Sequence, residues 1–253
     1  MYSLPVRMGE WYTLTADLND LMERLKYEKS MGLMDSQKLN KIRENLYSPT
    51  KKMTAKGPAF YGSPYQLINS DLIKAPTGPN KYISLSLAGT IDEVGVQKYD
   101  TLVDGCQIVA TPTIDPIMRN TFCFETVQVC DSTRGDVTYE EEMYIKMVGV
   151  PLYMKFTSNI LTLGTSAPVM LTSTPNEYCK FKIFFWEHCR RHTGFNTVKF
   201  DSRVIIRHMA SGKNLILKES RIPTLFGNEY EVTCDIIKDS HKAETAHSFW
   251  RIV

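Results

Sequence analysis

The sequence has almost no excess of charge of either sign and no long apolar run. Its 30 basic and 28 acidic residues give a formal net charge of +2 over 253 residues. So small a surplus is too weak for a protein that binds DNA or RNA by neutralising phosphates. No segment approaches the roughly 20 apolar residues of a transmembrane helix. We therefore expect neither a nucleic-acid partner nor a membrane partner.

Signals of export are also missing. There is no N-x-[ST] glycosylation sequon, and the opening MYSLPVRMGEWYTL has no uninterrupted apolar stretch of the kind found in signal peptides. No two of the six cysteines form a C-x-x-C pair. This pattern predicts reduced thiols in the cytoplasm. The cysteines are Cys106, Cys123, Cys130, Cys179, Cys189 and Cys234.

Two short segments hold the residue types of an active site without its spacing. In EHCRRH (187–192), His188 and His192 continue an expected strand, where residues four apart are about 13 Å from each other, too far for one zinc ion. In DSH (239–241), three adjacent residues cannot adopt the geometry of a hydrolase triad, so a polar turn is expected. No G-x-S-x-G elbow or phosphate-binding glycine loop occurs. We expect no enzyme activity, no metal and no cofactor.

The first fifty residues predict two helices. Thr15 to Met31 is rich in helix formers, and a second helix is expected from Asp35 or Ser36 until Pro49 stops it. Their apolar stripes are narrow, so each helix must dock on the body of the protein or on a partner. A linker with three prolines follows at 48–64. We therefore expect a helical arm and linker at 1–56 and a β domain at 57–253.

The rest of the chain alternates short β-rich runs with turn residues. No amphipathic pattern of helix length lies between these runs, which excludes a βαβ architecture and favours a barrel, sandwich or trefoil. The expected strands are YQLIN, KYISLSL, CQIVATPT, TFCFETVQVC, EEMYIKMVG, LYMKFT, CKFKIFFWEH, RVIIRHM, NLILKE and EYEVTCDIIK.

A weak internal repeat favours the trefoil among these folds. Three pairs of runs share one pattern: YQLIN with KYISLSL, EEMYIKMVG with LYMKFT, and RVIIRHM with NLILKE. Phe122, Trp186 and Trp250 recur at intervals of 64 residues and are expected to close the core of each repeat. The two tryptophans could instead line a sugar site, but their place at the repeat ends favours core packing. The predicted fold is mainly β, a β-trefoil with an N-terminal two-helix arm.

Several motifs resemble those of the cilia- and flagella-associated protein 161 family. The stretch TLFGNEYEVTCDIIKDSHKAETAHSFWRIV (224–253) is similar to the end of that family's proteins, and VRMGEW (6–11) is similar to its arginine-x-glycine-x-tryptophan opening. RNTF (119–122) and Tyr61-Gly62 also match. The resemblance covers 6–253. Its C-terminal positions are Phe226-Gly227, Glu229, Glu231, Asp239-Ser240-His241-Lys242 and Trp250.

The resemblance implies a structural microtubule inner protein with a fold like that of MIR-type β-trefoils. Such a protein lies in the lumen of the A-tubule of axonemal doublets, where it contacts the α/β-tubulin lattice and neighbouring inner proteins. The alternative from the residues alone is a cytoplasmic trefoil that binds carbohydrate or another ligand. The interface candidates are Arg7, Trp11, Lys51, Lys52, Arg119, Asn120, Phe226, Asp239 and His241.

Overall fold

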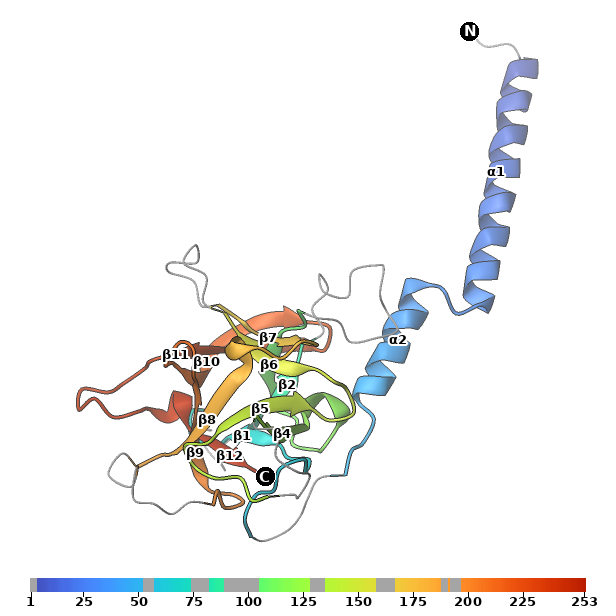
Figure 1. Ribbon diagram of the computed structural model, residues 1–253. Coiled ribbons are helices and arrows are strands. Elements are labelled where there is room, and N and C mark those ends of the chain that lie inside the picture. Colours follow the sequence, from blue (N-terminus) through green and yellow to red (C-terminus); the bar gives the residue numbers. More distant parts are fainter. Residues whose placement is uncertain are drawn as a thin grey trace. The chain divides into compact units, whose positions relative to one another are not determined.

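The structure is a computed structural model that describes residues 4–51, 57–73, 82–88, 105–127, 135–157, 167–187, 191 and 197–253 (Figure 1). The chain divides into two compact units, Met1–Asn45 and Leu46–Val253. This division comes earlier than the expected boundary at residue 56. Within the described residues, no helix combines the length and apolar character needed to cross a membrane.

Unit 1 is helical. Helix α1 spans Leu4–Ser30 and helix α2 spans Asp35–Leu46, so α1 begins well before the expected start at Thr15. Pro5 is compatible with this early start because the first turn of a helix has no use for the missing N–H. At the other end, Gly32 has a φ of +70°, and the N–H of Leu33 donates to the carbonyl of Glu28 at 2.8 Å. This is the glycine-terminated cap that ends a helix and reverses the chain.

Unit 2 is mainly β, as predicted. Its described residues contain twelve strands that pair antiparallel in one continuous sheet. Six of them form a ring in the order β4, β5, β8, β9, β12 and β1, closed by a pair of backbone hydrogen bonds between Tyr65 and Phe122 (2.7 and 2.8 Å). The strands are β1 (Leu67–Asn69), β2 (Ile83–Leu87), β3 (Ile108–Thr111), β4 (Phe122–Thr126), β5 (Glu142–Met147), β6 (Tyr153–Phe156), β7 (Val169–Thr172), β8 (Lys180–Phe185), β9 (Arg203–His208), β10 (Asn214–Thr224), β11 (Gly227–Asp235) and β12 (Trp250–Ile252).

The other six strands form three antiparallel pairs, β2 with β3, β6 with β7, and β10 with β11. The three neighbouring pairs expected from the repeats are also observed, through Ile68 opposite Ser84, Lys146 opposite Tyr153, and Arg207 opposite Asn214. All ten expected runs contain a strand. Strands β7 and β12, which are only four and three residues long, were not predicted from the sequence.

Three short 3-10 helices recur at equivalent places. They are η1 (Met118–Asn120), η3 (Glu177–Cys179) and η5 (Ala246–Ser248), and each precedes the last strand of a four-strand group. The residue two positions after each 3-10 helix is a large aromatic with at most 1% of its surface exposed: Phe122, Phe181 and Trp250.

This recurrence corrects the expected role of Trp186. The counterpart of Trp250 in the middle group is Phe181, whereas Trp186 is half-buried and packs edge-on against Phe249 at a ring distance of 6.0 Å. The successive spacings are 59 and 69 residues. An even period of 64 therefore missed the middle aromatic, because the loops of the second and third groups differ in length.

Candidate functional site

A buried ion pair lies where residues of the resemblance motifs meet. Nη2 of Arg119, in η1, is 2.6 Å from Oε1 of Glu229, in β11, and the two side chains are 1% and 4% exposed. Thr224 Oγ1 donates to the other oxygen of Glu229 at 2.9 Å. The Arg119 guanidinium lies 3.8 Å from the ring centre of Phe226 and 5.7 Å from that of Tyr47. We call these five residues the Arg119 cluster.

The Arg119 cluster fixes the segment by which the chain enters unit 2. Tyr47 packs edge-on against Phe226 at 5.3 Å, and Leu46 beside it is 3% exposed. The Thr50 N–H donates to the carbonyl of Pro116, and the Met118 N–H donates to that of Ser48, both at 3.0 Å. Residues 46–50 are therefore part of the folded domain, which explains why the boundary precedes the expected linker.

Arg119 and Asn120 do not lie on the surface, as an interface would require. Asn120 is fully buried, where its Nδ2 donates to the carbonyl of Asp115 at 2.9 Å and its Oδ1 accepts from the Ile117 N–H at 2.9 Å. Both side chains thus satisfy internal polar groups, as buried polar residues generally must. Arg119 joins η1 to β11 and Asn120 holds the η1 turn, which corrects their assignment as interface candidates.

The other interface candidates occupy different parts of the chain. Phe226 is half-buried and Lys51 is exposed, while Lys52 lies outside the described residues. Asp239 and His241 are exposed in a turn, where Asp239 Oδ1 accepts from the N–H of His241 at 2.8 Å. This arrangement is the expected polar turn. Arg7 and Trp11 fall within α1 at positions whose side chains are not described.

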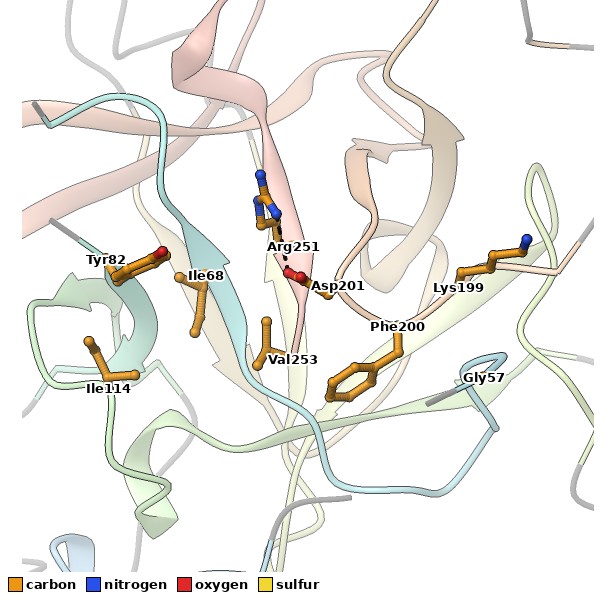
Figure 2. A pocket seen from close by; sticks show the side chains of 9 residues that line it. All are labelled: Gly57, Ile68, Tyr82, Ile114, Lys199, Phe200, Asp201, Arg251 and Val253. Carbon is orange, nitrogen blue, oxygen red and sulfur yellow. Dashed lines mark hydrogen bonds and ion pairs between the residues drawn. The ribbon is translucent and has the colours of Figure 1, made fainter. Parts of the chain in front are cut away.

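An open cleft of about 640 Å³ lies at one end of the strand ring. In Figure 2, Ile68, Tyr82 and Ile114 stand on one side of the cleft, Lys199 and Phe200 on the other. Tyr82 and Ile114 are each 46% exposed, so apolar surface is accessible to a ligand there. Arg251 reaches Asp201 with Nη1 3.2 Å from Oδ1, as the dashed line in Figure 2 marks. The remaining lining residues are Gly57 and Val253.

Three charged residues line this cleft: Lys199, Asp201 and Arg251. Arg251 and Asp201 neutralise one another, and in the described part of the chain no salt bridge involves the exposed Lys199. The lining of the cleft would accept a ligand that carries an apolar side chain next to a carboxylate.

The EHCRRH segment contributes a structural ion pair through Arg191. Its Nη1 lies 2.9 Å from Oε1 of Glu244, and its Nε donates to the Phe185 carbonyl at 2.8 Å. Burial opposes ionisation of Glu244, but the hydrogen bond and charge of Arg191 outweigh it and lower the pKa of that carboxyl. His188, Cys189 and His192 fall outside the described residues, and among those described no group of three His, Cys, Asp or Glu could hold a metal.

Burial governs the ionisation of three of the thiols that the structure describes. Cys106 and Cys123 are half-buried, and Cys179 and Cys234 are buried. Burial raises the pKa of Cys123, of Cys179 and of Cys234, which keeps these thiols protonated at neutral pH. Cys130 and Cys189 lie outside the described residues.

Solved structures share the fold at low sequence identity. A Caenorhabditis elegans protein of unknown function aligns with a TM-score of 0.54 and 11% identity, over 79% of this chain and 98% of that one. The SDF2-like protein of Arabidopsis thaliana aligns with a TM-score of 0.51 and 12% identity, over 78% and 94%. The protein O-mannosyltransferase Pmt1-Pmt2 complex of S. cerevisiae, bound to its sugar donor, gives 0.54 and 13%, over 83% and 28%. At these identities the likeness concerns the fold alone.

Similarity to curated proteins extends along the whole chain. A family model described as a cilia- and flagella-associated protein 161-like domain matches residues 152–253. The proteins named cilia- and flagella-associated protein 161 in Bos taurus and Mus musculus are 22% and 26% identical over 100% of this chain and over 82% and 88% of their own length. The Danio rerio protein of that name is 22% identical over 98% of this chain and 86% of its own. The chain is thus similar to the cilia- and flagella-associated protein 161 family, through the family model over residues 152–253 and through these relatives along nearly its whole length.

Proposed function

We propose that this protein is a structural, non-enzymatic component of the ciliary or flagellar axoneme. In this proposal it is a microtubule inner protein that binds the luminal face of the A-tubule wall of doublet microtubules, together with neighbouring inner proteins. The observation that carries the proposal is the match of 98–100% of the chain to relatives named as cilia- and flagella-associated. A match of that extent includes the helical arm as well as the β domain.

We also propose that unit 2 is a β-trefoil of the MIR type. Its support is the arrangement of twelve strands as three groups of four, each with one paired hairpin and two strands in the closed ring. The three recurring 3-10 helices, each followed by a buried aromatic, support the same threefold repetition. A closed ring leaves no free edge on its six strands, which suits a protein packed in a lattice.

In this function the protein engages the α/β-tubulin lattice through two parts. The arm carries exposed apolar side chains, and the β domain carries the exposed Lys51, the Asp239–His241 turn and the half-buried Phe226. Arg7, Trp11 and Lys52 are further contacts in this proposal, because Arg and Trp often anchor interfaces and Lys51-Lys52 adds positive charge. Two linked contacts give avidity that neither part has alone.

A second candidate is a cytoplasmic trefoil that binds a carbohydrate or another ligand. The open cleft at Tyr82, Ile114 and Phe200 favours it. The tryptophans that could have formed a sugar platform do not support it, since Trp250 is fully buried and Trp186 packs against Phe249. Retention in the axoneme without ligand would separate the two candidates.

The experiment is fractionation of axonemes that carry the tagged full chain. The protein should stay with doublet microtubules after detergent extraction and salt washing, and crosslinking should join it to tubulin or to an inner protein. Recovery in the soluble fraction, with no tubulin crosslink, would overturn the proposed function. A Phe200→Ala variant should remain with doublets if the cleft is not the anchor.

A further inference from the structure

Helix α1 carries a line of four exposed leucines, flanked on one side by Met22, which is 53% exposed. Leu14, Leu18, Leu21 and Leu25 are 61%, 57%, 56% and 44% exposed, and they follow one another at intervals of four, three and four residues. We call these four residues the arm seam. Glu28, three residues after Leu25, stands at the next position of the pattern and limits the seam at that end.

The spacing of the arm seam specifies a helix as its partner. Alternating intervals of four and three residues are the spacing by which one helix keeps a narrow line of side chains against a second helix, whereas a helix lying on a sheet or core shows a wider apolar face. An isolated helix gains little from propensity, and α1 contains Gly9, Thr13, Thr15 and Asn19 within its length. Burying the seam against another helix would supply the missing stabilisation.

The intervals between the four leucines are the same from either end of the helix. If a second copy of α1 runs antiparallel, Leu18 lies opposite Leu21 of the second copy and Leu14 lies opposite Leu25 of the second copy. Every seam position then meets a leucine, and one two-fold axis relates the two helices. Such a self-complementary patch is what a closed symmetric dimer requires.

The charges beside the seam favour this antiparallel arrangement. Asp17 and Arg24 both flank the seam on the same side, and the antiparallel pairing brings Asp17 next to Arg24 of the second copy twice. A parallel pairing would instead place Arg24 next to Lys29 of the second copy, and flanking charges decide partner choice and orientation in helix pairs. Arg24 is 80% exposed, and its only described ion pair is with Glu28 of the same helix, at 3.2 Å.

We propose that the arm seam joins two copies of this protein through antiparallel pairing of their α1 helices. This inference goes beyond the proposed axonemal role and concerns the protein in solution. Only four layers of leucine are buried, so the dimer is weak and its population depends on protein concentration.

The experiment is sedimentation equilibrium of the full chain over a range of concentrations. The unaltered chain should approach twice the monomer mass as concentration rises. Leu18→Glu should leave it monomeric, and Asp17→Arg should weaken dimerisation about four- to thirtyfold, because each of the two attractive pairs with Arg24 of the second copy becomes a repulsive one. The double variant Asp17→Arg with Arg24→Asp should restore the dimer, because the attractive pair is rebuilt with its signs exchanged.

Asp20→Arg is the matched control, since it makes the same charge change on the face away from the seam. It should dimerise like the unaltered chain. A chain that stays monomeric at all concentrations would overturn the proposal. A monomer is the result expected if the seam instead covers the β domain or another protein's helix. So would a dimer that Asp17→Arg leaves unchanged or that the double variant fails to restore. The assay contains no axonemes, so a negative result would overturn the dimer and would not bear on the proposed axonemal function.

Discussion

Arg119 and Glu229 lie 110 residues apart in the chain, yet Nη2 and Oε1 meet at 2.6 Å with almost no exposure to solvent. Breaking such a buried pair leaves one uncompensated charge, whereas replacing both partners with apolar groups does not. We expect Arg119→Ala to lower the free energy of unfolding by about 3–5 kcal/mol. Urea denaturation followed by circular dichroism measures this loss.

Two control experiments separate the cost of breaking this buried pair from the cost of losing an exposed pair or of replacing both partners. Lys213→Ala removes the partner of Asp235 in a pair that is 36% and 49% exposed, and it should cost less than about 1 kcal/mol. The double variant Arg119→Met with Glu229→Leu should be more stable than Arg119→Ala alone. Equal losses for Arg119→Ala and Lys213→Ala would mean that the Arg119 pair adds no more than a surface contact.

The structure predicts that Trp250 contributes more to the stability of the fold than Trp186 does. Trp250 is fully buried and its Nε1 donates to the Leu215 carbonyl at 2.9 Å, while Trp186 is half-buried. Trp250→Ala should cost about 3–5 kcal/mol of unfolding free energy. Trp186→Ala should cost clearly less, and thermal unfolding of both variants tests the difference. A larger loss at Trp186 would contradict the assignment of Phe181 as the middle core aromatic.

His208 should make stability depend on pH between 7 and 5. Burial lowers the pKa of His208, which more than offsets the hydrogen bond to the Tyr178 carbonyl. The folded state therefore favours the neutral ring, so stability is fully present above the unfolded pKa of about 6.5 and is lost as pH falls through the lower folded pKa. Unfolding free energy should be smaller at pH 5 than at pH 7, and His208→Gln should flatten this change. An unchanged slope in the variant would place the pH dependence elsewhere.

The mainly β fold was predictable because its strands are locally encoded. Alternating β-branched and aromatic residues marked ten strands, and neighbouring runs in the chain proved to be paired partners. The prediction that Trp186 closes the core of the middle repeat was wrong, because a uniform period cannot represent loops of unequal length. Phe181 lies in the same run, CKFKIFFWEH, and only the preceding 3-10 helix distinguishes it from Trp186.

The site was less predictable because its contacts are distant in sequence. RNTF and the segment around Phe226 are both motifs of the sequence, but no local pattern shows that Arg119 pairs with Glu229. A charged and an amide residue in succession are typical of a surface, and burial became visible only through the partners that satisfy them. The leucine spacing in the arm could be seen in the sequence, and the exposure of those leucines required the structure.

Truncation of the arm separates its role in folding from its role in binding. Unit 2 begins at Leu46, which is 3% exposed, and Tyr47 and Thr50 contact Phe226 and Thr121 within the domain. A chain lacking residues 1–45 should therefore unfold at nearly the same denaturant concentration as the full chain. A chain lacking residues 1–56 should lose about 1.5–3 kcal/mol or more, from the burial of the Leu46 side chain alone.

The same pair of chains tests the arm as an anchor. At equal expression, the chain lacking 1–45 should remain folded yet be retained on salt-washed doublets much less than the full chain, because one of two linked contacts is gone. The chain lacking 1–56 should show the same binding defect and, in addition, the loss of stability. Equal retention of the full chain and the chain lacking 1–45 would show that the β domain alone holds the protein in place. Weak retention combined with an unchanged unfolding curve would identify the arm as a binding element that the fold does not need.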